Sequence, residues 1–232
     1  MSEHISYQLE GRVATITMDD GKVNSISLDK LAALRQALDR AESEQAVVVL
    51  TGRDQRFSAG FDLKAIMQGG ELATRLVQEG FQLIERILTF PTPVVIACNG
   101  HAMAMGCFIL LSADLRIGAA GPFKIGANEV AIGMTLPYAA IELCRMRLSP
   151  THVVRASACA EIYSPEQAAV AGFLDRVVPV EELRGAAQEA AKGLTQLNMA
   201  AYRATKQRLR ASDLETLHRG LELDKSTWRV TS

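Results

Sequence analysis

The feature that most constrains the fold of this chain is a pair of short, unbroken apolar runs, at residues 46–51 (AVVVLT) and 94–98 (VVIAC). Both runs are rich in β-branched side chains and lack an alternation of apolar and polar residues. This pattern is typical of strands that are buried on both faces, as in parallel sheets. Each run is followed by a loop of small residues and then by a helical pattern. The order therefore predicts a parallel sheet with crossover helices.

The flanking segments extend this α/β pattern. Alternation over residues 5–18 predicts a hairpin that turns at Gly11 and Arg12, and Ser27 can cap a helix whose leucines recur every three or four residues. Strand signals become rare after Pro137, so we expect an α/β core of about 135 residues followed by a helical tail. Further expected elements are strands at 115–118 and 177–179, and helices at 71–88, 165–171 and 181–228.

Composition and charge exclude several classes of protein. With a net charge of −1 and 5% aromatic residues, the chain lacks the basic surface and the stacking platforms of nucleic-acid-binding proteins. Residues 1–7 lack the apolar segment of a signal peptide, and the longest apolar stretch, residues 101–113, is too short to cross a bilayer. We expect a cytoplasmic protein that binds neither nucleic acid nor membranes. Four cysteines in apolar runs are expected to be buried thiols: Cys98, Cys107, Cys144 and Cys159.

Two strand-to-helix junctions are the places where a parallel sheet would bind a ligand. Residues 56–64 (RFSAGFDLK) and 99–106 (NGHAMAMG) contain small residues that allow a ligand to approach the backbone. We expect a helix to open near Phe61 and to leave free N–H groups. Two such junctions can direct two N–H groups at one oxygen atom, as in an oxyanion hole. The pattern by itself is also compatible with ordinary tight turns.

Residues 57–64 (FSAGFDLK) resemble the F-[SA]-A-G-x-D-[LI]-K motif of the crotonase (enoyl-CoA hydratase/isomerase) superfamily. Residues 99–106 are similar to the N-G-x-A-x-G-G-G segment of that superfamily. Matches at Asn24 and at residues 91–99, 114–118 and 164–179 extend the resemblance to nearly the whole chain.

The resemblance implies a fold, a ligand and an assembly. The fold would be a crotonase-like β-β-α spiral core over residues 1–180, which carries a CoA-thioester site, and a shortened C-terminal α-helical trimerisation region over residues 181–232. The ligand would be an acyl-CoA thioester, so coenzyme A is part of the substrate and no separate cofactor is expected. Family members imply a homotrimer or a dimer of trimers.

The resemblance also places an oxyanion hole at the two junctions. Its donors would be the backbone N–H groups of Phe61 and Met105, which hold the thioester carbonyl and stabilise an enolate. Met105 and Ala104 stand where the family commonly has glycine. A side chain at position 105 is tolerable if it points away from the carbonyl.

The acidic residues distinguish among the reactions of the superfamily. Hydration works best with two carboxylates, but Phe108 stands at the position of the first hydratase glutamate. Glu129 matches the second glutamate, in a segment (residues 125–133) most similar to that of delta-3,delta-2-enoyl-CoA isomerases. A single base can move a proton from C2 to C4 of a 3-enoyl thioester. We expect Ile125, Val130 and Ile132 to surround Glu129 and raise its pKa.

Several further positions correspond to substrate contacts in the superfamily. Lys22 and Lys64 are candidate partners for CoA phosphates, although they could also be ordinary surface lysines. Four scattered histidines show no metal-ligand spacing, so no metal is expected. The alternatives to an isomerase are a hydratase or other CoA-thioester enzyme, and a non-catalytic acyl-CoA-binding homologue. The substrate-contacting residues implied are Lys22, Val23, Ala59, Asp62, Leu63, Lys64 and Phe108.

Overall fold

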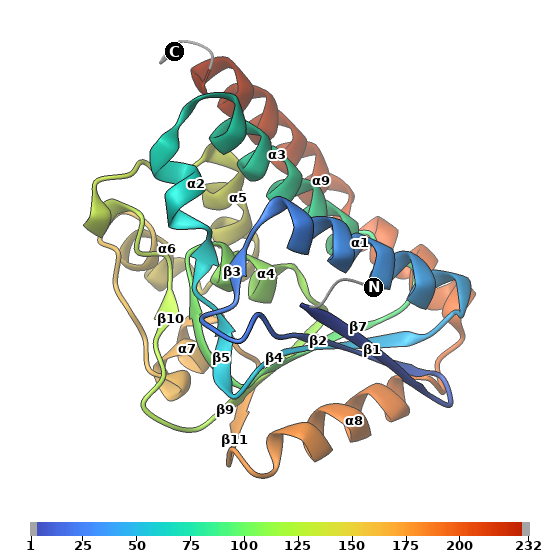
Figure 1. The fold of residues 1–232 in the computed structure, drawn as a ribbon. Coiled ribbons are helices and arrows are strands. Elements are labelled where there is room, and N and C mark those ends of the chain that lie inside the picture. Colours follow the sequence, from blue (N-terminus) through green and yellow to red (C-terminus); the bar gives the residue numbers. More distant parts are fainter. Residues whose placement is uncertain (1–3, 229–232) are drawn as a thin grey trace.

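The computed structural model describes the backbone of residues 4–228 and the side chains of residues 4–225. A six-stranded sheet in the order β1-β2-β4-β7-β9-β11 lies at its centre (Figure 1). β1 and β2 form the predicted antiparallel hairpin, and the other neighbouring pairs are parallel, which confirms the α/β class. The strands are β1 (Ile5–Glu10), β2 (Val13–Met18), β4 (Val47–Gly52), β7 (Val94–Cys98), β9 (Leu115–Ala119) and β11 (Arg176–Val178).

The two apolar runs form central strands that are buried on both faces, as predicted. In β4, Val48 and Leu50 belong to the larger core cluster, whereas Val47 and Val49 belong to a second cluster under α8 (Leu183–Leu194). This division explains the unbroken apolar pattern, because every side chain of the strand meets one of two helical layers.

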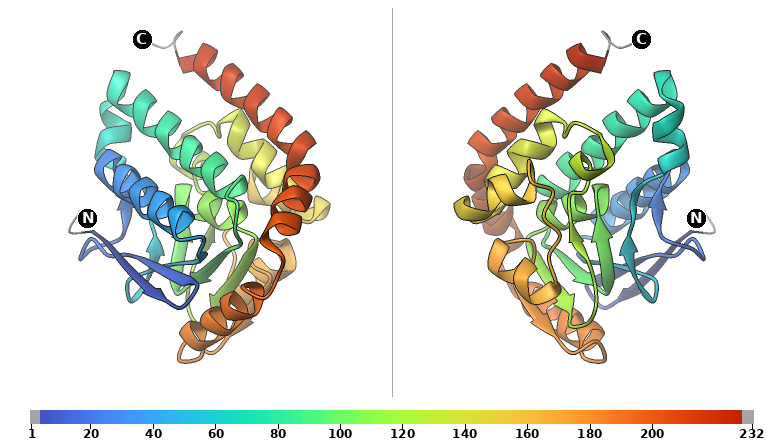
Figure 2. Two further views of the ribbon diagram at one scale, coloured as in Figure 1. Left: turned by 90° about the vertical axis from the view of Figure 1, so that its right-hand side faces the viewer. Right: turned by 90° about the vertical axis from the view of Figure 1, so that its left-hand side faces the viewer.

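Helices cover both faces of the central sheet (Figures 1 and 2). On one side, α1 packs on α3 and α3 packs on α4, and every residue of α4 is buried. On the opposite face, α8 packs on β2, β4, β7 and β9. The predicted cap of α1 is present, since the Ser27 side chain accepts a hydrogen bond from the backbone N–H of Lys30. The bounds are α1 (Leu28–Ser43), α2 (Leu63–Gln68), α3 (Gly70–Leu88), α4 (Met105–Ser112), α5 (Tyr138–Arg147), α6 (Pro150–Ala156) and α7 (Pro165–Ala171).

Short strands occur where loops were predicted. β5 (Gln55–Ser58) and β8 (Gly100–Met103) pair in parallel, and β8 also pairs with β10 (Ile125–Gly126). A separate parallel pair consists of β3 (Ser25–Ile26) and β6 (Gly60–Phe61). The loops expected after the two apolar runs therefore contain short paired strands. These strands are too short to show a hydrophobic period, and pairing between distant segments creates them.

The C-terminal part is helical, as predicted. α9 (Met199–Trp228) runs along α3 and α5 (Figure 2). Near its start, Lys206 Nζ and Arg210 Nη2 lie 2.7 Å and 3.1 Å from the carboxylate of Asp114, which precedes β9. Near its end, the Asp224 carboxylate accepts hydrogen bonds from the first backbone N–H groups of α5. Buried polar contacts therefore fix both ends of α9 on the core.

Three of the four cysteines, Cys98, Cys107 and Cys144, are buried as free thiols. Cys159 is exposed, so the prediction for this residue was wrong; it follows α6 near the surface. Of the helices in the described part of the chain, none combines the length and the apolar character that crossing a bilayer requires.

A substitution at Gly100 tests the close contact between β5 and β8. An added Cβ would lie 2.0 Å from the carbonyl oxygen of Gln55, so Gly100→Ala must push the two strands apart. We expect a loss of about 2–3 kcal/mol in the free energy of unfolding, measured by urea denaturation. Gly185→Ala is the control, because a Cβ there meets no atom within 4 Å on α8. It should change stability by less than about 1 kcal/mol. Equal effects of both substitutions would contradict this account.

Candidate active site

The contact between β6 and the start of α4 brings two backbone N–H groups together. Gly60 has a φ of +95°, and a Cβ added there would lie 3.3 Å from the Met105 nitrogen and 2.7 Å from Ala104 Cβ. Only glycine fits at this contact. Gly60, the residue bonded to the Phe61 nitrogen, therefore packs directly against the start of α4.

The directions of these two N–H groups follow from their elements. The Asp62 N–H donates to the Ile26 carbonyl at 3.0 Å, and because successive N–H groups of a strand point to opposite sides, the Phe61 N–H points away from β3. Met105 is the first residue of α4, where N–H groups have no carbonyl partner within the helix. The helix expected to open near Phe61 begins two residues later. Phe61 ends β6, and α2 begins at Leu63 with Asp62 as its cap.

The Met105 side chain is accommodated inside the core. A Cβ added to Gly80 of α3 would lie 3.2 Å from Met105 Cε and 2.4 Å from Phe61 Cζ, so the side chains of both residues pack against α3. Ala104 adopts a φ of +49°, an uncommon conformation for a residue other than glycine. Ala104 and Met105, which stand where the family motif has glycine, are therefore both compatible with the close contact between β6 and α4.

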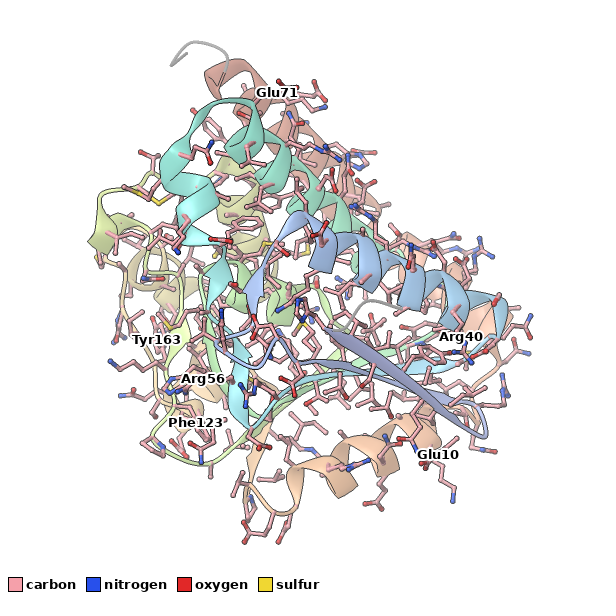
Figure 3. All side chains as sticks on the ribbon, viewed as in Figure 1. Glu10, Arg40, Arg56, Glu71, Phe123 and Tyr163 are labelled. Carbon is pink, nitrogen blue, oxygen red and sulfur yellow. The ribbon has the colours of Figure 1, made fainter. Side chains whose placement is uncertain are left out.

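β10 places Glu129 next to this contact. The backbones of Ile125 and Tyr163 exchange two hydrogen bonds, and the Ala104 N–H donates to the Gly126 carbonyl at 3.0 Å (Tyr163 is labelled in Figure 3). The strand is thus held beside the residue that precedes Met105. Glu129 follows three residues after Gly126, at the start of the short 3-10 helix η1 (Val130–Ile132).

The Glu129 side chain points into the protein. The residue is 9% exposed, and its Oε2 atom is buried with no hydrogen-bond partner among the described residues. Burial raises the pKa of Glu129 to about 7. Burial and then the charge of Glu129 raise the pKa of the thiols of Cys107, on α4, and Cys144, on α5. The carboxylate therefore faces α4 and α5.

The surroundings of Glu129 differ in part from the prediction. Ile125 is buried, but Val130 and Ile132 are 43% and 52% exposed and do not cover the carboxylate. A 3-10 turn directs their side chains outward, whereas an extended segment would have placed both on one face. The elevated pKa of Glu129 arises instead from the packing of α4 and α5.

No second carboxylate within the described residues contributes to the pKa of Glu129. Phe108, at the position of the first hydratase glutamate, is buried on α4, and its ring centroid lies 6.3 Å from that of Phe81. Glu129 is thus an isolated acid–base group on a segment that β10 ties to the start of α4, where the N–H groups of Phe61 and Met105 are candidate donors. Such an arrangement can move a proton at a carbon atom while an adjacent oxygen gains negative charge.

The residues expected to contact CoA lie together near β6. The Ala59 N–H donates to the Val23 carbonyl at 3.1 Å, which joins two of the expected segments. Asp62 is half-buried, and five of the other expected contact residues are exposed. The exposed residues are Lys22, Val23, Ala59, Leu63 and Lys64, the last two at the start of α2.

His101, in the second junction motif, has partners within the fold. His101 accepts a hydrogen bond from the Lys124 N–H and lies edge-on to Phe123, which Figure 3 labels. Burial, followed by Arg56 and Lys124, lowers the pKa of His101. Among the described residues, no group of three or more His, Cys, Asp or Glu side chains is arranged to hold a metal ion.

Sequence reasoning missed a buried polar cluster beside the site, formed by Asp20, Asn24, Lys30 and Ser58. Lys30 is 1% exposed and pairs with Asp20. A signal was present, because Lys30 precedes Leu34 by four residues and so falls on the apolar face of α1. A charged residue at such a position indicates a buried partner.

Comparison with known families agrees with this geometry. The family model described as enoyl-CoA hydratase/isomerase matches residues 8–231. The chain belongs to the enoyl-CoA hydratase/isomerase family. This confirms the resemblance inferred from the two junction motifs. A probable enoyl-CoA hydratase of Bacillus subtilis is 33% identical over 134 residues, which are 56% of this chain and 52% of that protein. The match thus spans about half the length of that relative.

Solved structures share the whole fold. An enoyl-CoA hydratase/isomerase family protein from Pseudomonas syringae gives a TM-score of 0.95 at 48% identity and covers 97% of each chain. An enoyl-CoA isomerase of Mycobacterium tuberculosis gives a TM-score of 0.93 at 41% identity, covering 97% of this chain and 99% of its own. Another structure of the same protein is named a probable enoyl-CoA hydratase. These likenesses confirm the crotonase-like fold and leave both reactions open.

The pKa of Glu129 predicts a pH-dependent effect of Glu129→Gln on stability. The unfolded carboxyl has a pKa of about 4.3, so rising pH ionises the unfolded state first and destabilises the fold up to about pH 7. The neutral glutamine avoids this loss. Its stabilising effect should grow by about 2 kcal/mol between pH 5 and pH 8 in urea unfolding experiments. Glu189→Gln, at an exposed position of α8, is the control. A pH-independent effect of Glu129→Gln would show that its carboxyl is solvated.

Proposed function

We propose that this protein is an enoyl-CoA isomerase that moves the double bond of a 3-enoyl-CoA thioester to the 2-position. The observation that carries the proposal is the lone buried carboxylate of Glu129, on the segment that β10 ties to the start of α4. The N–H groups of Phe61 and Met105 at this place are the proposed oxyanion donors. The reaction removes a proton from C2 and adds one to C4. One carboxylate with a pKa near 7 can do both, because it is ionised before the first transfer and protonated after it.

In the proposed reaction the two N–H groups stabilise the intermediate. They donate to the thioester oxygen, which gains negative charge as the proton leaves C2. Each donor contributes about 3–4 kcal/mol to the transition state. Phe108 takes the place of a second acid–base group, and its apolar ring keeps water from the dienolate. The proton held by Glu129 then passes to C4, which regenerates the ionised carboxylate.

A hydratase is the second candidate. The names of the Bacillus subtilis relative and of one Mycobacterium tuberculosis structure favour it. Against it, hydration works best with two carboxylates, and Glu129 has no carboxylate partner within the described residues. Met105 and Phe108, which replace residues common in the family, motivate a third candidate, a non-catalytic acyl-CoA-binding protein.

We further propose how the substrate and the subunits are arranged. The CoA part lies along Lys22, Val23, Ala59 and the start of α2, where the ammonium groups of Lys22 and Lys64 attract its phosphates. Coenzyme A arrives with the substrate, so the proposed reaction needs no other cofactor. Residues 1–180 carry the site, and residues 181–232 support a homotrimer or a dimer of trimers. The cytoplasm is the proposed location.

A comparison of two substrates tests the reaction. The protein should convert 3-hexenoyl-CoA to 2-hexenoyl-CoA much faster than it hydrates crotonyl-CoA, because one carboxylate suffices only for the first reaction. Both rates can be followed by absorbance and by mass spectrometry, since only hydration adds the mass of water. Faster hydration would favour the hydratase, and turnover of neither thioester despite CoA binding would favour the non-catalytic role.

Glu129→Gln should bind a CoA thioester with unchanged affinity and lower kcat by at least about 10²-fold, because the amide cannot accept the proton.

For the wild type, kcat/KM should rise with pH through about 7, as the buried carboxyl ionises. Steady-state kinetics from pH 5.5 to 8.5 measure both, with Glu189→Gln as the control. A flat profile, or an active Glu129→Gln variant, would exclude Glu129 as the base.

A further inference from the structure

The buried polar cluster between β2, α1 and β5 has no part in the reaction described above. Asn24, Lys30 and Ser58 are at most 1% exposed, although each carries a polar side chain. Burying such groups is costly unless their hydrogen bonds are satisfied. Ser58 of the cluster lies two residues before Gly60, the residue bonded to the Phe61 nitrogen.

Asn24 is the centre of the cluster. Its Nδ2 donates to the carbonyl of Met18, at the end of β2, and to the carbonyl of Arg56, in β5, at 2.8 Å and 3.0 Å. Its Oδ1 accepts from the Asp20 N–H at 3.1 Å and from Lys30 Nζ at 3.4 Å. The side-chain amide thus uses both of its donors and both acceptor sites, and it joins two strands that do not pair with each other.

The backbone of Asn24 connects the cluster to β6. Ser58 Oγ donates to the Asn24 carbonyl at 2.8 Å and accepts from the Gly60 N–H at 3.1 Å. Asn24 holds a φ of +54°, which asparagine tolerates better than most residues. Gly60 is bonded directly to Phe61, so this chain of hydrogen bonds ends one peptide unit from the candidate oxyanion donor.

An ion pair supports Asn24 from the other side. Lys30 Nζ lies 3.0 Å from Asp20 Oδ2, and the backbone N–H groups of Lys22, Asn24 and Ser25 also donate to the Asp20 carboxylate. Although burial acts to raise it, these donors hold the pKa of Asp20 at about 2. The carboxylate therefore stays ionised, and the turn that carries Asn24 is tied to α1.

We infer that Asn24 is a positioning residue for the oxyanion hole. It acts through Ser58 and Gly60 to hold the Phe61 N–H beside that of Met105, and the pair of Asp20 and Lys30 holds Asn24 in turn. The inference rests on the oxyanion hole of the proposed function, and it holds for any thioester reaction that uses this hole.

The test uses Asn24→Asp and Asn24→Gly, with the infrared band of a bound thioester carbonyl as readout. Aspartate keeps the shape but loses both donors, and glycine suits the positive φ. In the wild type, a 13C-labelled carbonyl of bound hexanoyl-CoA should absorb at lower frequency than free in solution, because two N–H groups polarise it. Both variants should move the band back toward the free position. They should lower kcat by about 10-fold or more, with KM changed far less.

Two further variants complete the experiment. Gln45→Gly is the matched control, because Gln45 also has a positive φ (+51°) but is exposed between α1 and β4, and it should keep the band and kcat. Ser58→Ala deletes only the hydroxyl that links Asn24 to Gly60, and it should shift the band partly even if the Asn24 variants do not fold. A wild-type band position in every folded variant of Asn24 and Ser58 would overturn the inference. If the wild type polarises the carbonyl but does not isomerise 3-hexenoyl-CoA, the proposed function fails and this inference stands.

Discussion

An unpaired carboxylate in a dry environment is the constraint on which the rest of the site depends. A buried charge without a partner is costly, and Glu129 avoids this cost by keeping its proton up to a pH near 7. The same property suits a group that must take and return a proton. In the proposed reaction the thioester carbonyl is the partner that makes ionisation useful. The carbon next to this carbonyl becomes more acidic when two N–H groups hold the oxygen. Acid–base group and oxyanion hole therefore require each other.

The scaffold brings these parts together through short strands and close backbone contacts. Gly60 lets β6 touch the start of α4, and Gly100 lets β8 lie against β5. β10 joins this layer and carries the chain to Glu129. Buried polar groups hold the layer in place: Asn24 ties it to the central sheet, and Asp114 ties α9 to the core. Rigid contacts of this kind fix donors to within the tolerance that catalysis requires.

Much of this could be predicted from the sequence. Buried parallel strands have a strong pattern, so β4 and β7 could be predicted. The junction motifs identified the family and made Phe61 and Met105 site candidates, and the segment of residues 125–133 did the same for Glu129. Three features could not be predicted. The two-residue to four-residue strands show no period, the outward direction of Val130 and Ile132 depends on a 3-10 turn, and the exposure of Cys159 depends on where α6 ends. The pairing of Lys30 with Asp20 could not be predicted for a related reason, because Asp20 lies on a loop whose path only the fold determines.

The central claim is that one carboxylate serves both carbons of the substrate. Its most direct test follows the proton itself, with 3-hexenoyl-CoA deuterated at C2 as substrate in ordinary water. If Glu129 carries the isotope from C2 to C4 inside a dry site, a substantial fraction of the 2-hexenoyl-CoA formed should contain deuterium at C4, as measured by NMR and mass spectrometry. Product that has lost one deuterium from C2 and carries none at C4 would show that separate groups, or water, perform the two transfers.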